Sequence, residues 1–375
     1  MGKKVLITGG AGFIGSHAAD ELLRSGHAVR ILDNLSPQVH GPGPQRPEYL
    51  SPDAELVIGD VRDRTAVKKA LRGIDAVVHL ASMVGVGQSM YEIESYTSVN
   101  SLGTAVLLQS VIARPAGSVG RLVVASSMSI YGEGLYKDSN GWTGTVPDRG
   151  IEQLRAGDWE LRGPEGERLR PVPTPEHKAP SLASIYALSK YHQEKMCLIF
   201  GKAYNIPVIA LRFFNCFGTR QALSNPYTGV LAIFAARILN GNSPLIFEDG
   251  LQKRDFVSVY DAARAIRLSV EAGGDESAAV NIGSGKCHTV LSIAERMIKL
   301  LGRNGLRPAI TKKYRVGDIR HCFADISFAG KFLNYEPRVN IDSGLKELAA
   351  WLEKQKPEDR VMAAAAELAA RRLTV

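Results

Sequence analysis

The chain has 375 residues, of which 45% are hydrophobic and 22% are charged, as expected for a globular protein with one large domain or two interlocked ones. Its apolar runs are too short for a membrane span, and glycines interrupt the apolar start at 5–15, so we predict neither a membrane helix nor a signal peptide. The net charge is +8, but basic residues are scattered among acids, which favours a small anionic ligand over nucleic acid. Four separated cysteines without a C-x-x-C pair argue against a metal site or disulfides and suit a cytoplasmic protein.

Strand and helix signals alternate through the first 127 residues. Short β-branched runs predict strands at 4–10, 28–34, 54–60, 75–82 and 121–127. Helical periodicity appears between them at 13–26, 66–73 and 100–115. Strands that are separated by helices predict βαβ units, and therefore an α/β fold with a parallel sheet.

The alternation stops at residues 134–184, which are rich in glycine, proline and charge. A loop of this length is usually functional or disordered, and only 151–162 is expected to form a short helix. The periodic pattern returns with a helix at 184–204 and a strand at 207–215. Mixed signals follow, with predicted strands at 244–249 and 279–285 and predicted helices at 290–302, 341–355 and 361–373.

Gly9, Gly12 and Gly15 form a G-x-x-G-x-x-G pattern between the first strand and the first helix. Glycine lets the backbone turn tightly and approach a pyrophosphate, which the helix N-terminus then binds. Asp33 ends the next strand, where a carboxylate accepts hydrogen bonds from an adenosine ribose and repels a 2′-phosphate, so we predict NAD rather than NADP. Asp60 ends the third strand and either reaches the adenine amino group or is a solvated turn residue.

The segment "IYALSKYHQEK" contains Tyr-x-x-x-Lys twice, as Tyr186 with Lys190 and as Tyr191 with Lys195. Residues five apart on a helix lie about 140° apart, so the two pairs face different directions. The first pair lies nearer the strand end that carries Ser127, and these three residues suit removal of a hydroxyl proton while a hydride leaves for NAD. The tyrosine pKa of about 10 must then be lowered, for which we expect the lysine ammonium and the nicotinamide cation. We expect the second pair to be a packing and surface feature.

These motifs, with "GDVRD", "HLAS", "SSMSIYGE", "LRFFNCFG", "RDFVSVYDAA", "NIGSG" and "RVGD", resemble those of the extended short-chain dehydrogenases/reductases in the NAD-dependent nucleotide-sugar epimerase/dehydratase family. The resemblance runs from residue 3 to about 350, apart from the insertion at 134–184. It implies a Rossmann-type doubly wound parallel sheet with a smaller mixed α/β substrate-binding domain, and a homodimer. The implied NAD-binding domain is 1–212 and 247–265, the nucleotide-sugar domain is 213–246 and 266–355, and 356–375 is a helical tail.

The resemblance also implies which residues surround the ligands. For NAD these are Gly9, Gly12, Phe13, Ile14, Gly15, Asp33, Asn34, Asp60, Val61, Leu80, Ala81, Ser82, Asn100, Tyr186 and Lys190. For the nucleotide sugar they are Val84, Ser127, Ser129, Asn215, Arg254, Arg315, Asp318 and Cys322. The two arginines are expected to clamp the diphosphate with charge-assisted bonds, and Asn100 is expected to support Lys190 through the helix backbone.

The residues after Ser127 bear on the reaction. Sugar 4,6-dehydratases of the family carry Asp-Glu there, and decarboxylases tend to carry a glutamate, whereas this chain has Met128 and Ser129. The resemblance therefore implies an NAD-dependent nucleotide-sugar 4-epimerase, which oxidises C4 and returns the hydride to the opposite face. Reduction of a 4-keto sugar stays open as an alternative, as does a non-catalytic dinucleotide-sensing or RNA-associated protein.

Two features concern the sugar. Cys322 aligns with a pocket-lining position, where its small size would admit larger substituents, although a buried small hydrophobe is an equal interpretation. The insertion at 134–184 is expected to form a lid or wall over the sugar, and it resembles dTDP-L-rhamnose 4-epimerase-like sequences most. Both UDP- and dTDP-linked sugars stay open as substrates.

Overall fold

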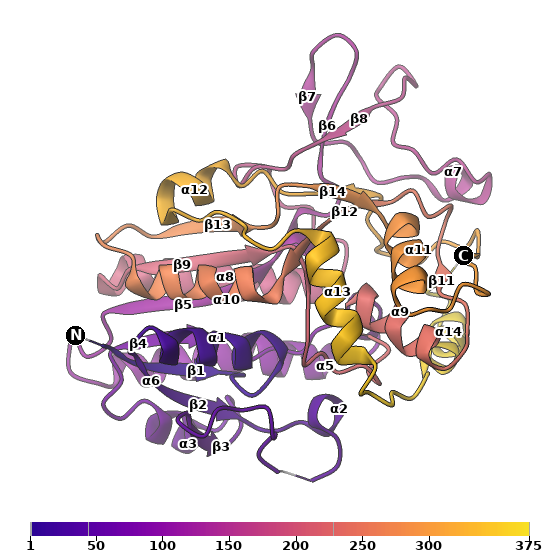
Figure 1. The fold of residues 1–375 in the computed structure, drawn as a ribbon. Helices are drawn as coiled ribbons and strands as arrows, with labels where there is room; N and C mark the ends of the chain where they lie inside the picture. Colours follow the sequence, from indigo (N-terminus) through magenta and orange to yellow (C-terminus); the bar gives the residue numbers. More distant parts are fainter. Residues whose placement is uncertain (1, 44, 228, 375) are drawn as a thin grey trace.

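The apolar runs predicted as strands form one seven-stranded sheet in the computed structural model, which describes residues 2–43, 45–227 and 229–374 (Figure 1). The strand order is β13-β9-β5-β4-β1-β2-β3, and every neighbouring pair is parallel. The bounds are β1 Lys4–Thr8, β2 Ala28–Asp33, β3 Glu55–Ile58, β4 Ala76–His79, β5 Arg121–Ser127, β9 Val208–Phe213 and β13 Ala278–Ile282. The predicted Rossmann-type sheet is thus confirmed.

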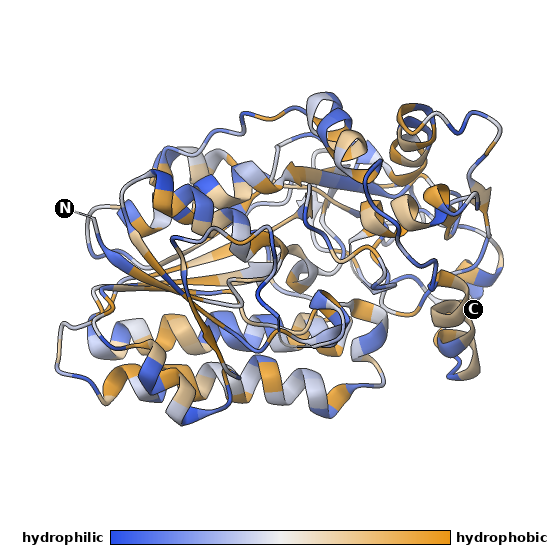
Figure 2. Cartoon of the chain, turned by 60° about the horizontal axis from the view of Figure 1, so that its bottom comes forward, coloured by the Kyte–Doolittle hydropathy of each residue, from blue (hydrophilic) through white to orange (hydrophobic). Residues whose placement is uncertain are grey.

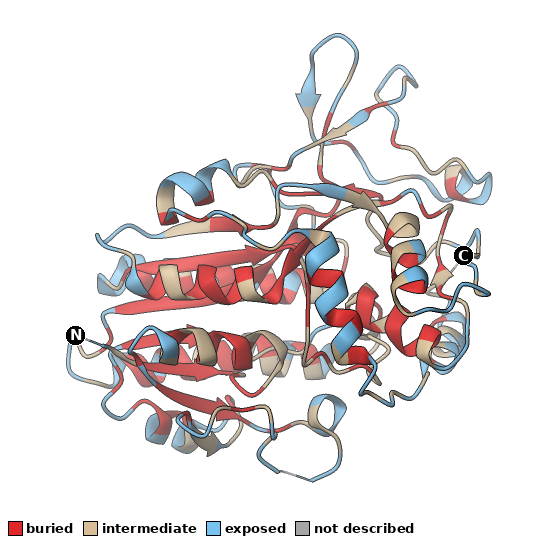
Figure 3. Ribbon diagram, in the orientation of Figure 1, coloured by how far each residue is buried: buried red, intermediate tan, exposed pale blue. Residues whose placement is uncertain are grey.

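Helices cover both faces of this sheet because successive strand side chains point to opposite faces. Val5 and Ile7 pack under α1 (Phe13–Arg24) and α10 (Val259–Glu271). Leu6 between them packs on the other face, under α3 (Arg64–Ala70), α6 (Gly103–Ile112) and α8 (Ile185–Tyr204). Figure 3 shows the strands between these two layers as buried, and Figure 2 shows the same strands as mainly hydrophobic.

A smaller sheet lies beside the carboxyl ends of the large one. It contains β10 (Asn215–Phe217), β12 (Lys253–Ser258), β14 (Cys287–Thr289) and β16 (His321–Cys322). Its helices α9 (Val230–Leu239), α11 (Val290–Leu300) and α13 (Ile341–Leu352) share a separate hydrophobic core. The strands β11 (Leu245–Ile246) and β15 (Ala309–Ile310) form a further short pair.

Two of the expected domain boundaries differ from this arrangement. The range 247–265 was assigned to the NAD-binding domain, but β12 within it belongs to the small sheet. The range 266–355 was assigned to the sugar domain, but β13 within it completes the large sheet beside β9. The pairing of β12 within the small sheet and the pairing of β13 with β9 each join strands that are distant in the chain. A local sequence pattern therefore predicts neither of them. Residues 1, 44, 228 and 375 of the expected ranges lie outside the described residues.

The insertion has a small fold of its own. It carries an antiparallel sheet of β6 (Leu135–Lys137), β7 (Thr143–Gly144) and β8 (Arg170–Val172), together with α7 (Ile151–Arg155) in the segment predicted to be helical. Tyr136, Val146, Leu161 and Leu169 form its buried cluster. Figure 1 shows it projecting above the small sheet, and Figure 3 shows that much of its surface is exposed.

The remaining helices are short or terminal. They are α2 (Pro37–His40), α4 (Val86–Ser89), α5 (Ile93–Tyr96), a π-helix at Thr97–Leu102, a 3-10 helix at Met128–Tyr131, α12 (Ser327–Leu333) and α14 (Val361–Ala370). The helix predicted at the C-terminal end is therefore present as α14. Within the described ranges, no helix combines the length and apolar character needed to cross a membrane.

Candidate active site

The glycine turn after β1 has the geometry of a dinucleotide site. Gly9 has φ 69°, which favours glycine, and a Cβ there would lie 2.7 Å from the backbone nitrogen of Ala81. A Cβ on Gly15 would lie 2.4 Å from the Gly9 carbonyl oxygen, so helix α1 packs closely on the turn. A Cβ on Gly12 would approach only that carbonyl, at 3.4 Å, which leaves this side open. Since α1 begins after Gly12 without a side-chain cap, its first amides suit a pyrophosphate, and the site fits NAD.

The predicted adenosine residues lie at the same edge of the sheet. The Asp33 carboxylate at the end of β2 accepts hydrogen bonds from the backbone amides of Ala11 (3.0 Å) and Leu35 (2.9 Å). Asp60 follows β3 and accepts from the Asn34 side chain at 3.2 Å. Hydrogen bonds from Arg62 hold the pKa of Asp60 below its usual value. The structure thus brings Asn34 and Asp60 together and places Asp33 against the glycine turn.

Ser127, Tyr186 and Lys190 come together where β5 and α8 meet. Ser127 is the last residue of β5, and α8 begins at Ile185, capped by the Ser184 side chain. Burial raises the pKa of Tyr186 to about 12, although the nearby Ser127 hydroxyl favours the ionised form. The Ser127 oxygen also accepts from the Ser129 hydroxyl at 2.9 Å. The three residues therefore lie on β5 and α8, two elements that pack against each other.

Lys190 is buried, and its ammonium donates to the Gln193 side chain at 2.8 Å. Burial lowers the pKa of Lys190 to about 7. The sequence predicted that Lys190 lowers the pKa of Tyr186, but the protein alone shows a raised tyrosine pKa. The reason is that desolvation acts on both groups and the lysine is turned toward Gln193.

Gln193 was missed by the sequence analysis, although it lies only three residues after Lys190, on the same helix face. Its amide nitrogen donates to Thr104 at 3.0 Å and lies 3.2 Å from a His79 ring nitrogen. Burial lowers the pKa of His79 to about 3, so this imidazole is neutral. Together these buried groups form a hydrogen-bonded support behind the lysine.

Asn100 holds the segments around Lys190 together. It lies in the π-helix, a feature that often marks functional sites, and it is fully buried. Its side chain bonds both the amide (2.8 Å) and the carbonyl (3.1 Å) of Met83, and it donates to the Ser189 hydroxyl at 2.9 Å. Asn100 therefore fixes the loop after β4 to the Ser189 side chain beside Lys190. Its backbone carbonyl accepts from the Thr104 hydroxyl, which in turn accepts from Gln193 beside Lys190.

The loops after β3, β4 and β9 provide further predicted positions. Val61 is buried, Ala81 touches the glycine turn, and Val84 is 52% exposed. Asn215 begins β10, and its side-chain oxygen is buried without a hydrogen-bond partner in the part of the chain that the structure describes. Such an unpaired acceptor suits a ligand hydroxyl. The other predicted cofactor positions, Leu80 and Ser82, flank Ala81.

The two predicted diphosphate arginines lie on neighbouring segments. Arg254 is in β12, whose partner β16 follows the loop that carries Arg315 and Asp318. Arg315 is paired with Asp318 at 2.7 Å. Arg254 instead donates to main-chain carbonyls, including that of Arg320 at 2.9 Å. Both arginines are half-buried.

Cys322 does not line an open pocket. It is only 1% exposed, and its sulfur lies 3.9 Å from the Thr174 hydroxyl of the insertion. It packs with Met128 and Phe214 in a small hydrophobic cluster. The structure therefore supports the interpretation of a buried small hydrophobe, and the insertion fills the space that the small side chain leaves.

The C-terminal tail reaches the same site. The Val316 amide donates to the Leu373 carbonyl at 3.0 Å, and Arg315 forms a β-bridge with Thr374. The Arg371 guanidinium lies 4.4 Å from the centre of the Tyr91 ring, in a cation–π contact. The tail therefore holds the loop that carries Arg315.

Comparisons with known proteins agree with this geometry. The chain matches the family model described as "NAD dependent epimerase/dehydratase family" over residues 5–150 and 163–283. It is 32% identical to a dTDP-L-rhamnose 4-epimerase of Burkholderia thailandensis, over 94% of this chain and 96% of that protein. Its structure resembles that of the Thermotoga maritima UDP-glucose 4-epimerase with UDP-glucose (TM-score 0.75, 30% identity, 94% and 99% coverage). It also resembles the Thermus thermophilus UDP-glucose 4-epimerase complex with NAD (TM-score 0.70, 27% identity, 94% and 100% coverage).

The fold and the glycine turn define a dinucleotide-dependent enzyme. The chain belongs to the NAD-dependent epimerase/dehydratase family. The predictions of an NAD-dependent nucleotide-sugar 4-epimerase and of NAD as its cofactor are confirmed by these relatives.

Proposed function

We propose that this chain inverts C4 of a nucleoside diphosphate hexose with the residues assembled at the end of β5. The observation that carries the proposal is the place of Ser127, which ends β5 and accepts a hydrogen bond from Ser129, next to the first turn of α8 with Tyr186 and the buried Lys190. Met128 is packed in a hydrophobic cluster and Ser129 is bonded to Ser127, so neither supplies the acid and base that dehydration needs. The arrangement supports exchange at C4 without elimination at C5 and C6.

Each residue has a role that its surroundings allow. Tyr186 takes the proton of the C4 hydroxyl and later returns it, while Ser127 hydrogen-bonds the same oxygen. Lys190, one helical turn after Tyr186, is assigned to the cofactor ribose. Bound NAD supplies the hydride acceptor and donor. Arg254 and Arg315 hold the diphosphate, so that the sugar ring can present either face to the cofactor.

The experiment that tests this function needs no added cofactor. The purified protein is incubated separately with UDP-glucose, UDP-glucuronate, UDP-N-acetylglucosamine, dTDP-L-rhamnose and dTDP-glucose, and each mixture is analysed by proton NMR. Inversion at C4 of one sugar supports the proposal and identifies the substrate. Stoichiometric NADH consumption with a 4-keto sugar would instead indicate a reductase, and no reaction in either assay would indicate a non-catalytic protein.

We also propose a homodimer formed through α5, the π-helix, α6 and α8. This face exposes large apolar side chains, among them Ile93 (48%), Leu102 (53%) and Ile199 (68%). A hollow between these helices is lined by Ile93, Leu102 and Met196. Light scattering after size-exclusion chromatography should give twice the chain mass, and Leu102→Asp should give a monomer. A monomeric wild type would reject the proposal.

A further inference from the structure

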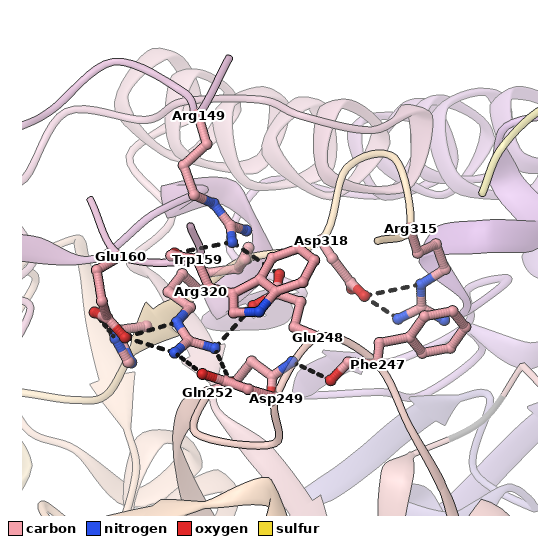
Figure 4. Close-up of polar contacts among 12 residues, drawn as sticks. Arg149, Trp159, Glu160, Phe247, Glu248, Asp249, Gln252, Arg315, Asp318 and Arg320 are labelled. Atoms are coloured by element: carbon pink, nitrogen blue, oxygen red, sulfur yellow. Dashed lines mark hydrogen bonds and ion pairs between the residues drawn. The ribbon is translucent and has the colours of Figure 1, made fainter. Parts of the chain in front are cut away.

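Arg320 is fully buried among carboxylates from two separate parts of the chain (Figure 4). Its guanidinium bonds Glu160 of the insertion at 2.5 Å. It also bonds Glu248 at 2.8 Å and Asp249 at 2.6 Å, both of which lie between β11 and β12. Removing one partner of such a buried pair is more disruptive than removing a surface pair, because charges are left without compensation.

The backbone of the same residue faces the predicted diphosphate site. The amides of Arg320 and His321 donate to the Glu133 carboxylate, at 2.7 and 3.1 Å. The carbonyls of Ile319 and Arg320 accept from the Arg254 guanidinium, the second at 2.9 Å. The side chain of Arg320 is thus held by acids, and its carbonyl holds Arg254.

Insertion contacts reinforce this segment. The Glu160 carboxylate, whose pKa hydrogen bonds from His321 and Arg320 lower to about 2, also lies 3.1 Å from the His321 ring nitrogen. Arg149 of the insertion pairs with Glu248 at 2.8 Å (Figure 4). The insertion therefore contacts Arg320 directly through Glu160 and also contacts another acidic partner of Arg320. The insertion is therefore tied to the start of β16 and to the residue before it.

Arg254 and Arg315 are oriented in chemically different ways. Arg315 is paired with a carboxylate, which offsets its charge. The bonds to Arg254 come from neutral carbonyl oxygens, which fix the direction of the guanidinium but leave its positive charge available to an anion. The orientation of the Arg254 guanidinium therefore depends on the position of the carbonyls of residues 319 and 320.

We propose that Glu160 and Arg320 are positioning residues for Arg254. Through them the insertion holds carbonyls 319 and 320 in the place from which they orient the arginine toward the substrate diphosphate. This inference rests on the proposed function of Arg254 as a diphosphate ligand. It gives the insertion a role in nucleotide binding in addition to the predicted wall over the sugar.

The test variant is Glu160→Gln, which keeps the side-chain shape and removes its charge. Its matched control is Asp158→Asn in the same insertion, because Asp158 pairs with Arg162 in a partly exposed ion pair. UDP and dTDP are titrated into each NAD-bound protein by calorimetry, and KM and kcat are measured with the sugar found by NMR. We expect Glu160→Gln to weaken nucleoside diphosphate binding and raise KM about tenfold, with kcat within about twofold, and Asp158→Asn to match the wild type.

A double-mutant cycle with Arg254→Gln separates positioning from general loosening. If Glu160 acts through Arg254, then Glu160→Gln weakens binding by less than about twofold once Arg254 is replaced. Additive effects, an unchanged dissociation constant in Glu160→Gln, or a loss confined to kcat would each overturn the inference. If C4 inversion by the wild type persists in those cases, only the positioning role fails. A wild type that neither binds UDP or dTDP nor inverts any sugar would overturn the proposed function as well.

Discussion

The Lys190 ammonium lies 2.8 Å from the Gln193 side-chain oxygen, and both residues are buried on one face of α8. Burial removes the Lys190 amine from water, which favours its neutral form over the ammonium. The cost of protonating Lys190 in the folded protein leads to a prediction about stability.

Lys190 gives the NAD-free protein a specific pH dependence. Its pKa is about 7 when folded against 10.5 for an ordinary lysine, so between these values the unfolded chain binds more protons. The free energy of unfolding therefore rises with pH across this window, by up to about 1.4 kcal/mol per pH unit from this group. Lys190→Met should remove that rise between pH 7 and 9, as measured by urea unfolding. Parallel curves for the two proteins would contradict the buried, neutralised lysine.

Tyr186 carries the proton transfer in our account. Tyr186→Phe removes the phenolic oxygen and keeps the ring, so kcat should fall about 10²–10⁴-fold while NAD stays bound. The measurement combines initial rates with the absorbance of NAD released on denaturation. Tyr191→Phe is the matched control, because Tyr191 packs in the cluster with Met128 and lies 5.2 Å from the Lys195 ammonium. Equal losses in the two variants would argue against the assignment.

The C-terminal tail should contribute to substrate binding through the loop of Arg315. Leu368 is buried in α14, where it packs against Gly87. Leu368→Asp should release the tail from Val316 and raise KM several-fold, whereas kcat and NAD content should change little. Met362→Asp on the same helix is the control, because Met362 is 60% exposed. Unchanged KM in the Leu368 variant would show that the tail has no such role.

Deletion of residues 140–178 tests the wall over the sugar. The deletion removes Thr174, which covers Cys322, and both insertion partners of the Arg320 cluster. Sugar turnover should be lost, while NAD binding at the distant glycine turn should persist. A deletion of only the exposed hairpin tip at 139–142 should leave turnover intact. Full activity in the larger deletion would rule out the wall.

Much of the NAD site could be predicted from the sequence because its signals are local. Buried parallel strands produce short β-branched runs, and the turn from β1 into α1 requires glycine at Gly9. The spacing of Tyr186 and Lys190 places them on one helix face. Their position near Ser127 could then be predicted from the strand signal of β5.

Other parts depend on contacts between distant segments. No local pattern shows that β13 pairs with β9, or that Thr174 covers Cys322. The acids that bond the Arg320 side chain come from residues 160, 248 and 249, and the sequence pattern around each is that of a surface charge. The pKa shifts of Tyr186 and Lys190 were also missed, since burial depends on the whole packed structure.

The central claim is that one hydride leaves C4 and returns to the same carbon. The most direct measurement uses the identified nucleotide sugar with deuterium at C4, incubated with the purified protein in ordinary water without added cofactor. Our account predicts that the epimer formed keeps the deuterium at C4, as seen by NMR and mass spectrometry. Exchange of the label with solvent, or turnover that consumes NADH mole for mole, would contradict it.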